Sequence, residues 1–242
     1  MTTLLLSDLH LPRIPSPLRD AFIAFLDGPA RGTDAVYILG DLFEYWIGDD
    51  AGVVHYAPEA EALQRLTASG VAVYFQGGNR DFILGRDFFK RTGVKPLPDP
   101  YTTDIGGVRT VLSHGDVFCT DDVPYQRWRR FSRIPSAQRM FHALPLSFRR
   151  AFGDGLRSHS EDARSYKRKS ILDVNPNAIE RTFVKSGAPR MIHGHTHRPT
   201  EHQLDIGGQP RERIVLADWR DDRKEYLEVS DGKFVRKLVE PV

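Results

Sequence analysis

The feature that most constrains the fold is a short apolar segment that recurs along the chain and each time leads into a polar side chain. Segments of this kind lie at residues 3–7, 35–39, 71–75 and 108–112. Their length and continuous apolar character predict strands that are buried on both faces. The polar residues that follow them closely are Asp8, His10, Asp41, Asn79 and His114. In a sheet layered with helices, ligand sites form just beyond the strand ends, so the sequence predicts an α/β fold with one such site.

A fifth segment, Arg190–Ile192, leads into histidines at positions 193, 195 and 197. Neutral imidazole is the commonest side-chain ligand of transition metals, and Gly194 allows the backbone to turn tightly between two rings. A run of three histidines can also form an ordinary surface turn, so its meaning depends on the ligands that the other strand ends supply. We interpret His193, which precedes the glycine, as a structural residue or one that orients a ligand.

Together these strand ends offer more ligands than one metal ion needs. The candidates are Asp8, His10, Asp41, Asn79, His114, His195 and His197. Hard oxygen ligands mixed with imidazoles suit manganese, iron or zinc better than calcium or magnesium alone. Two ions about 3.5–4 Å apart that share a carboxylate would use the whole set. Asp41 is the natural bridge because a carboxylate has two oxygens. Any one of these residues alone would more simply be a structural polar group.

Composition is that of a globular protein. The 242 residues suffice for one large domain with an insert, and 40% of them are hydrophobic and 27% charged. The net charge of +2 argues against a polyanion-binding molecule as a whole. The single cysteine, Cys119, is expected to be a small buried side chain in a protein from a reducing compartment. No apolar run is long enough to span a membrane, and the apolar start lacks a basic flank, so we expect a cytoplasmic protein.

Apolar spacing also predicts several helices and late strands. Helices are expected at residues 18–26, 58–69, 158–173 and 176–185, and strands at 213–217, 225–229 and 234–239. The helix at 158–173 would carry Ser160, Arg164 and Lys167 on one face, because they are spaced by four and three residues.

The stretch between residues 123 and 160 is basic and aromatic. It holds eight arginines, and its only acidic residue is Asp154. Three prolines divide it into short helices, which we expect to form a small insert over the sheet edge. Such a face suits an anionic lipid at a membrane surface, or a nucleic acid whose bases would stack on the aromatic rings. The plainer alternative is that the apolar side chains form the insert's own core. We expect this of most of them, with a minority lining an acyl-chain groove.

The chain resembles the calcineurin-like metallophosphoesterase superfamily in five blocks that occur in the family's order. These are Asp8-Leu9-His10, Gly40-Asp41, Gly78-Asn79, His114-Gly115 and Gly194-His195-Thr196-His197. The resemblance implies a two-sheet αββα sandwich as a single domain over 1–242, with a helical insert, or lid, at about 121–175. It implies one ion bound by Asp8, His10, Asp41 and His197. The second ion would then be bound by Asp41, Asn79, His114 and His195.

One position departs from the pattern of many superfamily members, which carry histidine after the metal-binding asparagine. Here that residue is Arg80. Arginine does not give up its proton usefully, but its forked donors can hold developing phosphate charge. A leaving group that is itself a phosphate needs little protonation, so Arg80 favours cleavage of a phosphoanhydride. The catalytic residues that we expect are therefore Asp41, Asn79, Arg80 and His195.

A narrower resemblance is to the UDP-2,3-diacylglucosamine hydrolase family. The residues that carry it are Asn79-Arg80-Asp81-Phe82, Asp121-Asp122, Tyr125-Gln126 and Ile171-Leu172-Asp173-Val174-Asn175-Pro176. It implies water attack on the α-phosphorus of UDP-2,3-diacylglucosamine, which gives 2,3-diacylglucosamine 1-phosphate (lipid X) and UMP in lipid A biosynthesis. It also implies two manganese ions, and a monomer that binds peripherally to the cytoplasmic face of the inner membrane without nucleic acid. The implied substrate contacts are Asn79, Arg80, Asp122, Ser160, Arg164, Lys167 and His195, although the family more often has asparagine at position 164.

Two other functions stay open at this point. The chain could be a different dinuclear-metal phosphodiesterase that acts on nucleic acid or soluble nucleotides. It could also be a metal-binding scaffold that has lost catalysis, an alternative that the complete set of ligands opposes.

Overall fold

The structure is a computed structural model that describes residues 1–155 and 173–240. Its described residues form two β-sheets. The first has the strand order β11-β10-β1-β2-β3-β4 and the second β5-β6-β7-β9-β8. The strands of the first sheet are β1 (Thr2–Leu6), β2 (Ala35–Leu39), β3 (Ala72–Gln76), β4 (Lys95–Leu97), β10 (Glu225–Ser230) and β11 (Lys233–Leu238). Those of the second are β5 (Tyr101–Ile105), β6 (Val108–Ser113), β7 (Arg190–His193), β8 (Thr200–Ile206) and β9 (Gln209–Val215).

Parallel pairing brings the predicted strand ends into line. In the first sheet Leu6 pairs with Ile38, and Ile38 pairs with Phe75, so the loops after β1, β2 and β3 start at one level. In the second sheet Ser113 pairs with His193, which aligns the ends of β6 and β7. The two sheets face each other across a core that both supply, whose members include Leu5, Leu39, Leu112, Ile192 and Leu227. The ends of both sheets therefore meet at one edge of the sandwich.

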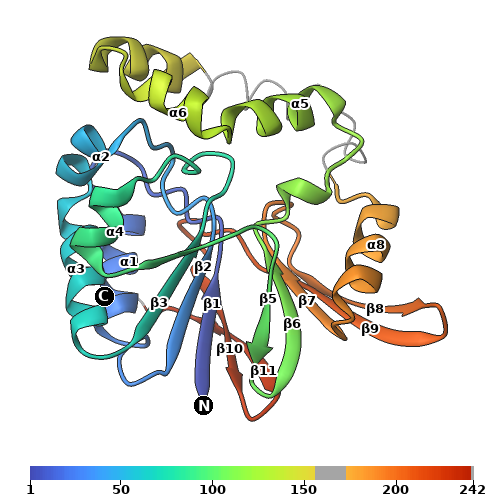
Figure 1. Ribbon diagram of the computed structural model, residues 1–242. Coiled ribbons are helices and arrows are strands. Elements are labelled where there is room, and N and C mark those ends of the chain that lie inside the picture. The colour runs from blue at the N-terminus through green and yellow to red at the C-terminus, as the bar shows by residue number, and fades with distance from the viewer. Residues whose placement is uncertain (156–172, 241–242) are drawn as a thin grey trace.

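Helices cover the outer faces of the sandwich (Figure 1). On the first sheet these are α1 (Pro17–Asp27), α2 (Asp49–His55), α3 (Ala57–Ala68) and α4 (Arg86–Thr92), and on the second α8 (Pro176–Ser186). Helix α1 begins where the Ser16 hydroxyl accepts a hydrogen bond from the Arg19 amide, and Pro17 occupies the first turn. Helix α8 is capped in the same way by Asn175 and packs Ile179 and Phe183 against the second sheet.

The helices after β6 lie over the strand ends, at the top of the view in Figure 1. A single 3-10 turn, η1 (Asp116–Phe118), leads into α5 (Val123–Ser132) and α6 (Pro135–His142), and residues 146–155 are also helical. The extent of the insert, at about 121–175, stays a prediction. Its expected helix at 158–173 lies outside the described residues.

The expectation that most apolar side chains of the insert form its own core is wrong for the described part. Several of its large apolar residues are exposed, namely Phe131, Ile134, Met140, Leu144, Phe148 and Phe152. Aromatic rings do touch, with Trp128 and Phe141 each near Phe152 at centroid distances of 6.0 and 5.4 Å. Helix α6 has no buried residue and the one in α5 is Ser132, so these short helices leave apolar side chains exposed.

Two smaller expectations can be compared with the structure. Cys119 is buried, as predicted. Among the helices of residues 1–155 and 173–240, none has the length and the apolar character that crossing a membrane requires.

Candidate metal centre

The backbone is unusual at the strand ends. Of the described residues other than glycine, six have a positive φ angle: Asp8, His10, Asp41, His195, His197 and Asp231. A side chain makes this left-handed region unfavourable, and such residues gather at functional sites. Asp231 lies in the tight turn between β10 and β11. The other five are all predicted metal ligands, so the chain bends sharply at the positions where it presents them.

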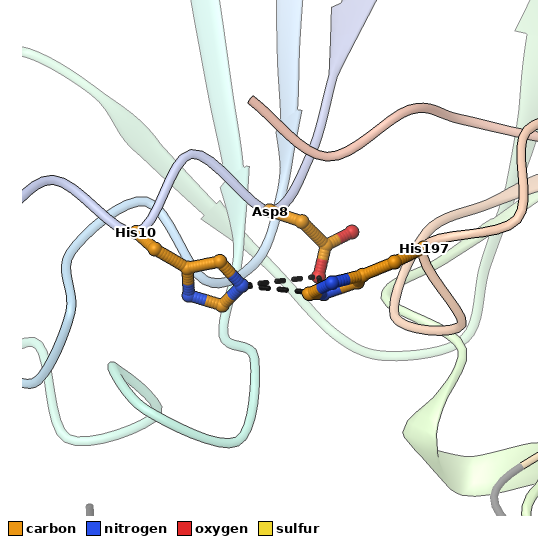
Figure 2. Close-up of side chains that lie close together, drawn as sticks. All are labelled: Asp8, His10 and His197. Carbon is orange, nitrogen blue, oxygen red and sulfur yellow. Dashed lines mark hydrogen bonds and ion pairs between the residues drawn. The ribbon is translucent and has the colours of Figure 1, made fainter. Parts of the chain in front are cut away.

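The first cluster joins the loops after β1 and β7. Figure 2 shows Asp8, His10 and His197 pointing toward one another. His197 Nε2 lies 3.3 Å from Asp8 Oδ1 and 3.3 Å from His10 Nε2. Each residue thus offers one ligand atom within a sphere small enough for a single ion.

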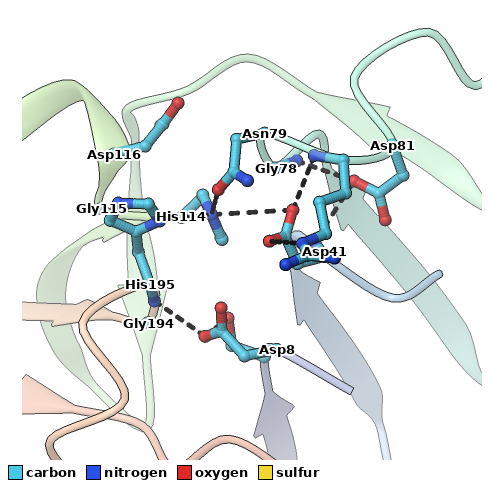
Figure 3. Close-up of polar contacts among 12 residues, drawn as sticks. Asp8, Asp41, Gly78, Asn79, Asp81, His114, Gly115, Asp116, Gly194 and His195 are labelled. Atoms are coloured by element: carbon cyan, nitrogen blue, oxygen red, sulfur yellow. Dashed lines mark hydrogen bonds and ion pairs between the residues drawn. The ribbon is translucent and has the colours of Figure 1, made fainter. Parts of the chain in front are cut away.

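The second cluster shares Asp8 with the first, and Figure 3 shows Asp8, Asp41 and His114 together with Asn79 and His195. Asp8, Asp41 and His114 offer ligand atoms that all lie within 4.8 Å of one another. His114 Nε2 is 3.1 Å from Asn79 Oδ1 and 3.2 Å from His195 Nδ1. The other ring nitrogen of His114 lies 2.9 Å from the carbonyl oxygen of Leu39, which orients the ring so that Nε2 faces the cluster.

Two carboxylate oxygens in the clusters lack a hydrogen-bond partner in the part of the chain that the structure describes. Asp8 Oδ1 and Asp41 Oδ2 are buried and have no hydrogen-bond partner among the described residues. Buried polar atoms are normally paired, and a buried charge without a counter-ion is costly. The other oxygen of Asp8 accepts bonds from the Ser7 hydroxyl and the His195 amide, both at 2.7 Å. This leaves Oδ1 directed at the cluster, so the residues present fit a bound divalent ion.

The pKa values in this cluster report the same demand for positive charge. Burial lowers the pKa of His114, but the carboxylates of Asp41 and Asp8 outweigh it and raise that pKa to about 9. Without a metal ion, His114 would therefore be protonated, and its positive charge would take the place of a bound cation. Burial and the neighbouring His114 lower the pKa of His195 to about 3, so His195 is a neutral imidazole, the form that binds metals.

Two glycines allow the loops after the strands to approach one another closely. A Cβ atom on Gly194 would overlap the side chains of Ser7 and Asp8, and one on Gly78 would overlap Asp41. Gly78, beside Asn79, and Gly194, beside His195, are thus required by the close contact between strand ends.

Comparison with known proteins fits this geometry. Residues 1–199 match the model of the calcineurin-like phosphoesterase family. A protein of Stenotrophomonas maltophilia (strain K279a) is 46% identical over 90% of this chain and 91% of its own length. One of Aromatoleum aromaticum is 48% identical over 92% and 91%, and one of Xanthomonas axonopodis pv. citri is 42% identical over 98% and 99%. All three are named UDP-2,3-diacylglucosamine hydrolase. This chain belongs to the UDP-2,3-diacylglucosamine hydrolase family. Its membership confirms the predicted fold class, the two-sheet αββα sandwich of the calcineurin-like phosphoesterases.

In this hydrolase-family chain, Asp81 is a buried carboxylate that supports the site. Its oxygens accept hydrogen bonds from the backbone amides of Asp41, Leu42 and Gly78, at 3.2, 2.7 and 2.9 Å. Burial and the neighbouring Asp41 raise the pKa of Asp81 to about 7. Asp81 thus joins the loop after β2 to the loop after β3. In the sequence, its position beside Asn79 and Arg80 is the one feature that points to this supporting role.

Asp218 is a second supporting carboxylate, and it touches the first cluster. Its Oδ2 lies 3.4 Å from Nδ1 of His197, on the side of the ring that faces away from Asp8. A carboxylate behind a metal-binding imidazole fixes the ring and raises its basicity. Asp218 directly follows the strand predicted at 213–217, so the strand-end rule that indicated the ligands could also have found it.

Some of the predicted substrate contacts lie among the described residues and others lie outside them. The Arg80 amide donates to Asp41 Oδ1 at 2.9 Å, and its guanidinium Nε lies 3.9 Å from Asp41 Oδ2, so Arg80 borders the cluster. Asp122 accepts a hydrogen bond from the Tyr125 amide at 3.2 Å and thereby caps α5. The remaining predicted contacts, at positions 160, 164 and 167, lie outside the described residues. The roles of all these residues stay predictions.

His193 lies apart from the ligands, consistent with the structural interpretation. Its ring is buried, with Nδ1 2.9 Å from the Gly194 carbonyl oxygen and Nε2 3.1 Å from Arg213. Burial and the Arg213 charge lower its pKa to about 4, so His193 is neutral and accepts a hydrogen bond from the guanidinium.

Proposed function

We propose that this chain hydrolyses the pyrophosphate bond of UDP-2,3-diacylglucosamine, with lipid X and UMP as products. Relatives that carry the hydrolase name are 42–48% identical over at least 90% of the chain, which supports the substrate. The observation that carries the proposal is the paired cluster, in which buried Asp8 and Asp41 lie among imidazoles and present unpaired oxygens.

The proposal includes two manganese ions. Asp8, His10, Asp41 and His197 would hold one, and Asp41, Asn79, His114 and His195 the other. Bound there, such ions polarise phosphoryl oxygens and lower the pKa of a coordinated water. Carboxylate oxygens mixed with imidazoles suit manganese, and Asp8, which belongs to both clusters, supports a joint site.

The chain's own donors would stabilise the diphosphate. Arg80 borders the second cluster with a guanidinium that is mostly buried, and its Nε has no hydrogen-bond partner among the described residues. A buried guanidinium aimed at the site can donate to a phosphoryl oxygen whose charge grows during the reaction. We assign Asn79 and His195 to the same oxygens. Because the leaving group is a sugar phosphate, no side chain is needed to protonate it.

We further propose that the insert binds the cytoplasmic face of the inner membrane, where the acylated substrate resides. Its exposed apolar side chains are accompanied by exposed arginines, at positions 127, 130, 139 and 150. Apolar side chains entering a lipid surface while arginines contact anionic headgroups would give such peripheral binding. Co-sedimentation with vesicles of anionic and of zwitterionic lipid measures it. A chain that binds neither kind of vesicle would contradict the proposal.

One experiment separates the proposed activity from the two other functions. The purified chain is offered UDP-2,3-diacylglucosamine, single-stranded DNA and a generic phosphodiester, each with manganese added and then removed by a chelator. Release of UMP from the first substrate alone, and only with manganese, is the expected result. Preferred cleavage of DNA or the phosphodiester would support the other class of phosphodiesterase. Bound manganese without cleavage of any of the three substrates would support the metal-binding scaffold. Asp41→Ala is the control, because it removes a ligand that both ions would share.

A further inference from the structure

Helix α5 is attached to the sandwich by charged side chains and not by apolar packing. Within α5, which is described in full, Ser132 is the one buried residue. Tyr125, Arg129 and the C-cap residue Arg133 are spaced by four, so they project from one face of the helix. All three side chains contact Asp116, the first residue of η1, which follows β6. The seating of α5 thus depends on the geometry of a few hydrogen bonds.

Asp116 is the centre of this network. Its carboxylate is fully buried, and Oδ2 accepts from Arg129 Nε at 2.8 Å and from Arg133 at 3.2 Å, as well as from the Tyr125 hydroxyl. Hydrogen bonds between charged partners are short and strongly directional, and a buried carboxylate cannot exchange them for water. Moving α5 would therefore break bonds that nothing nearby can replace.

The network continues to both sides of the second cluster. Another nitrogen of Arg129 donates to Asp99 at 2.9 Å. Asp99 in turn accepts from the Ser113 hydroxyl at 2.6 Å and from the His114 amide at 3.2 Å, so it holds the backbone of a predicted ligand. On the other side, Arg133 donates to the carbonyl oxygen of Gly78 at 2.9 Å.

Gly78 is the residue before Asn79, another predicted ligand, so Arg133 restrains that loop from outside. The guanidinium of Arg133 also lies over the ring of Phe82, at 5.1 Å from its centroid. The two arginines therefore contact the two loops that carry Asn79 and His114, whose side chains meet at 3.1 Å.

We infer that Arg129 and Arg133 are positioning residues that hold Asn79 and His114 in place for the second ion. The inference rests on the proposed metal site. Because the same arginines seat α5, this helix and the second ion stabilise each other. An ion bound at the second cluster favours the seated α5, and a displaced α5 weakens that ion. Coupling of this kind is reciprocal.

A matched control exists at the other end of the insert. Arg149 also ties an insert helix to the sandwich by a charged pair, with Asp50, and by a bond to the carbonyl oxygen of Ile47 at 2.6 Å. Asp50 lies in α2 and Ile47 just before it, so neither belongs to the loops that carry Asn79 and His114. Arg149→Met therefore loosens the helical stretch at 146–155 and leaves the contacts of Arg129 and Arg133 on α5 in place.

The test is calorimetric titration of the metal-free chain with manganese, in the absence of substrate. Residues that support metal ligands are worth about 10- to 100-fold in affinity. Arg129→Met and Arg133→Met should each weaken one of the two binding steps by about that factor, and Arg149→Met should change neither. Arg129→Lys, which keeps the charge and loses the fork, should restore affinity only in part.

The outcomes are distinguishable. Wild-type affinity in both Arg129→Met and Arg133→Met would overturn the inference, and so would an equal loss in Arg149→Met. If the arginine variants do not fold by circular dichroism, the near-isosteric Asp99→Asn decides in their place by the same measurement. A wild-type chain that binds manganese in two steps but releases no UMP refutes the proposed activity and leaves this inference standing. A wild-type chain that binds no manganese refutes both.

Discussion

The carboxylate of Asp218 holds an imidazole of the first cluster from behind, and Asp218→Asn measures the strength of that hold. The side chain is 4% exposed, and its Oδ2 lies 3.4 Å from His197 Nδ1. An amide keeps the shape and one acceptor oxygen but removes the negative charge. The ring would then be oriented less firmly and would donate less electron density to an ion on its other nitrogen.

The size of the effect follows from the other contacts of this carboxylate. Supporting partners of this type are worth about 10- to 100-fold in metal affinity. Here Arg220 and Arg223 also donate to Asp218, each at 2.7 Å, and they withdraw charge from it. The distance of 3.4 Å to His197 is longer than the usual range of about 2.7–3.2 Å for a hydrogen bond. Both facts place the loss at the lower end, about tenfold, or about 1.4 kcal/mol.

Manganese titration of the metal-free protein is the assay, and a double variant supplies the control. Arg220→Met with Arg223→Met removes both competing cations and leaves the carboxylate on His197. Its manganese affinity should equal or exceed that of the wild type. The reasoning is refuted if Asp218→Asn binds manganese as tightly as the wild type. It is refuted equally if the double arginine variant loses as much affinity as Asp218→Asn, because then order in the loop and not the carboxylate would matter.

Three further predictions concern other parts of the chain. Arg19→Met should destabilise the fold by about 3–5 kcal/mol. It leaves the buried Glu59 carboxylate, which Arg19 contacts at 2.6 and 2.8 Å, without its charged partner. A shift of the urea midpoint worth less than about 1 kcal/mol would contradict this. Arg80→Ala should slow UMP release by about 100-fold while manganese binding persists, and unchanged turnover would remove Arg80 from the reaction. The hydrogen bond from Arg65 lowers the pKa of Asp27 in the folded protein below its ordinary value of 3.8. This pair therefore stabilises the fold above pH 3.8, and the stabilisation is lost as the pH falls through the pKa that Asp27 has in the folded protein. Arg65→Met should therefore lower the urea midpoint at neutral pH but not at about pH 2, and an equal shift at both would exclude a charge effect.

The buried parallel strands are predictable because both of their faces are covered. Strand β2 occupies Ala35–Leu39, the range that its apolar run predicts. Strand β8 has no such signal, because it lies at the edge of its sheet and its side chains alternate between exposed and half-buried. Helices α2 and α4 span seven residues each, and both have a glycine as N-cap residue, which offers no capping side chain. Two turns are too few for an apolar period to emerge from the sequence.

The candidate site is predictable to the extent that residue type and strand ends reveal it. Those two signals indicate the seven candidate ligands, which the structure brings to one edge of the sandwich. The groups that support them are less visible. Asp81 acts by accepting backbone amides from a loop about 40 residues earlier in the chain, and Arg129 acts through Asp99. Contacts of this kind form only when the sheets have folded, so the position of a single aspartate or arginine in the sequence does not predict them.

The left-handed backbone at five predicted ligands has a consequence for the stability of this protein. A side chain in that region costs about 1–2 kcal/mol, so the five positions together oppose folding by an amount comparable to the net stability of a domain. Glycine at any of them would relieve that opposition. A variant with glycine at one of these positions should therefore be more stable than the wild type and bind metal less well.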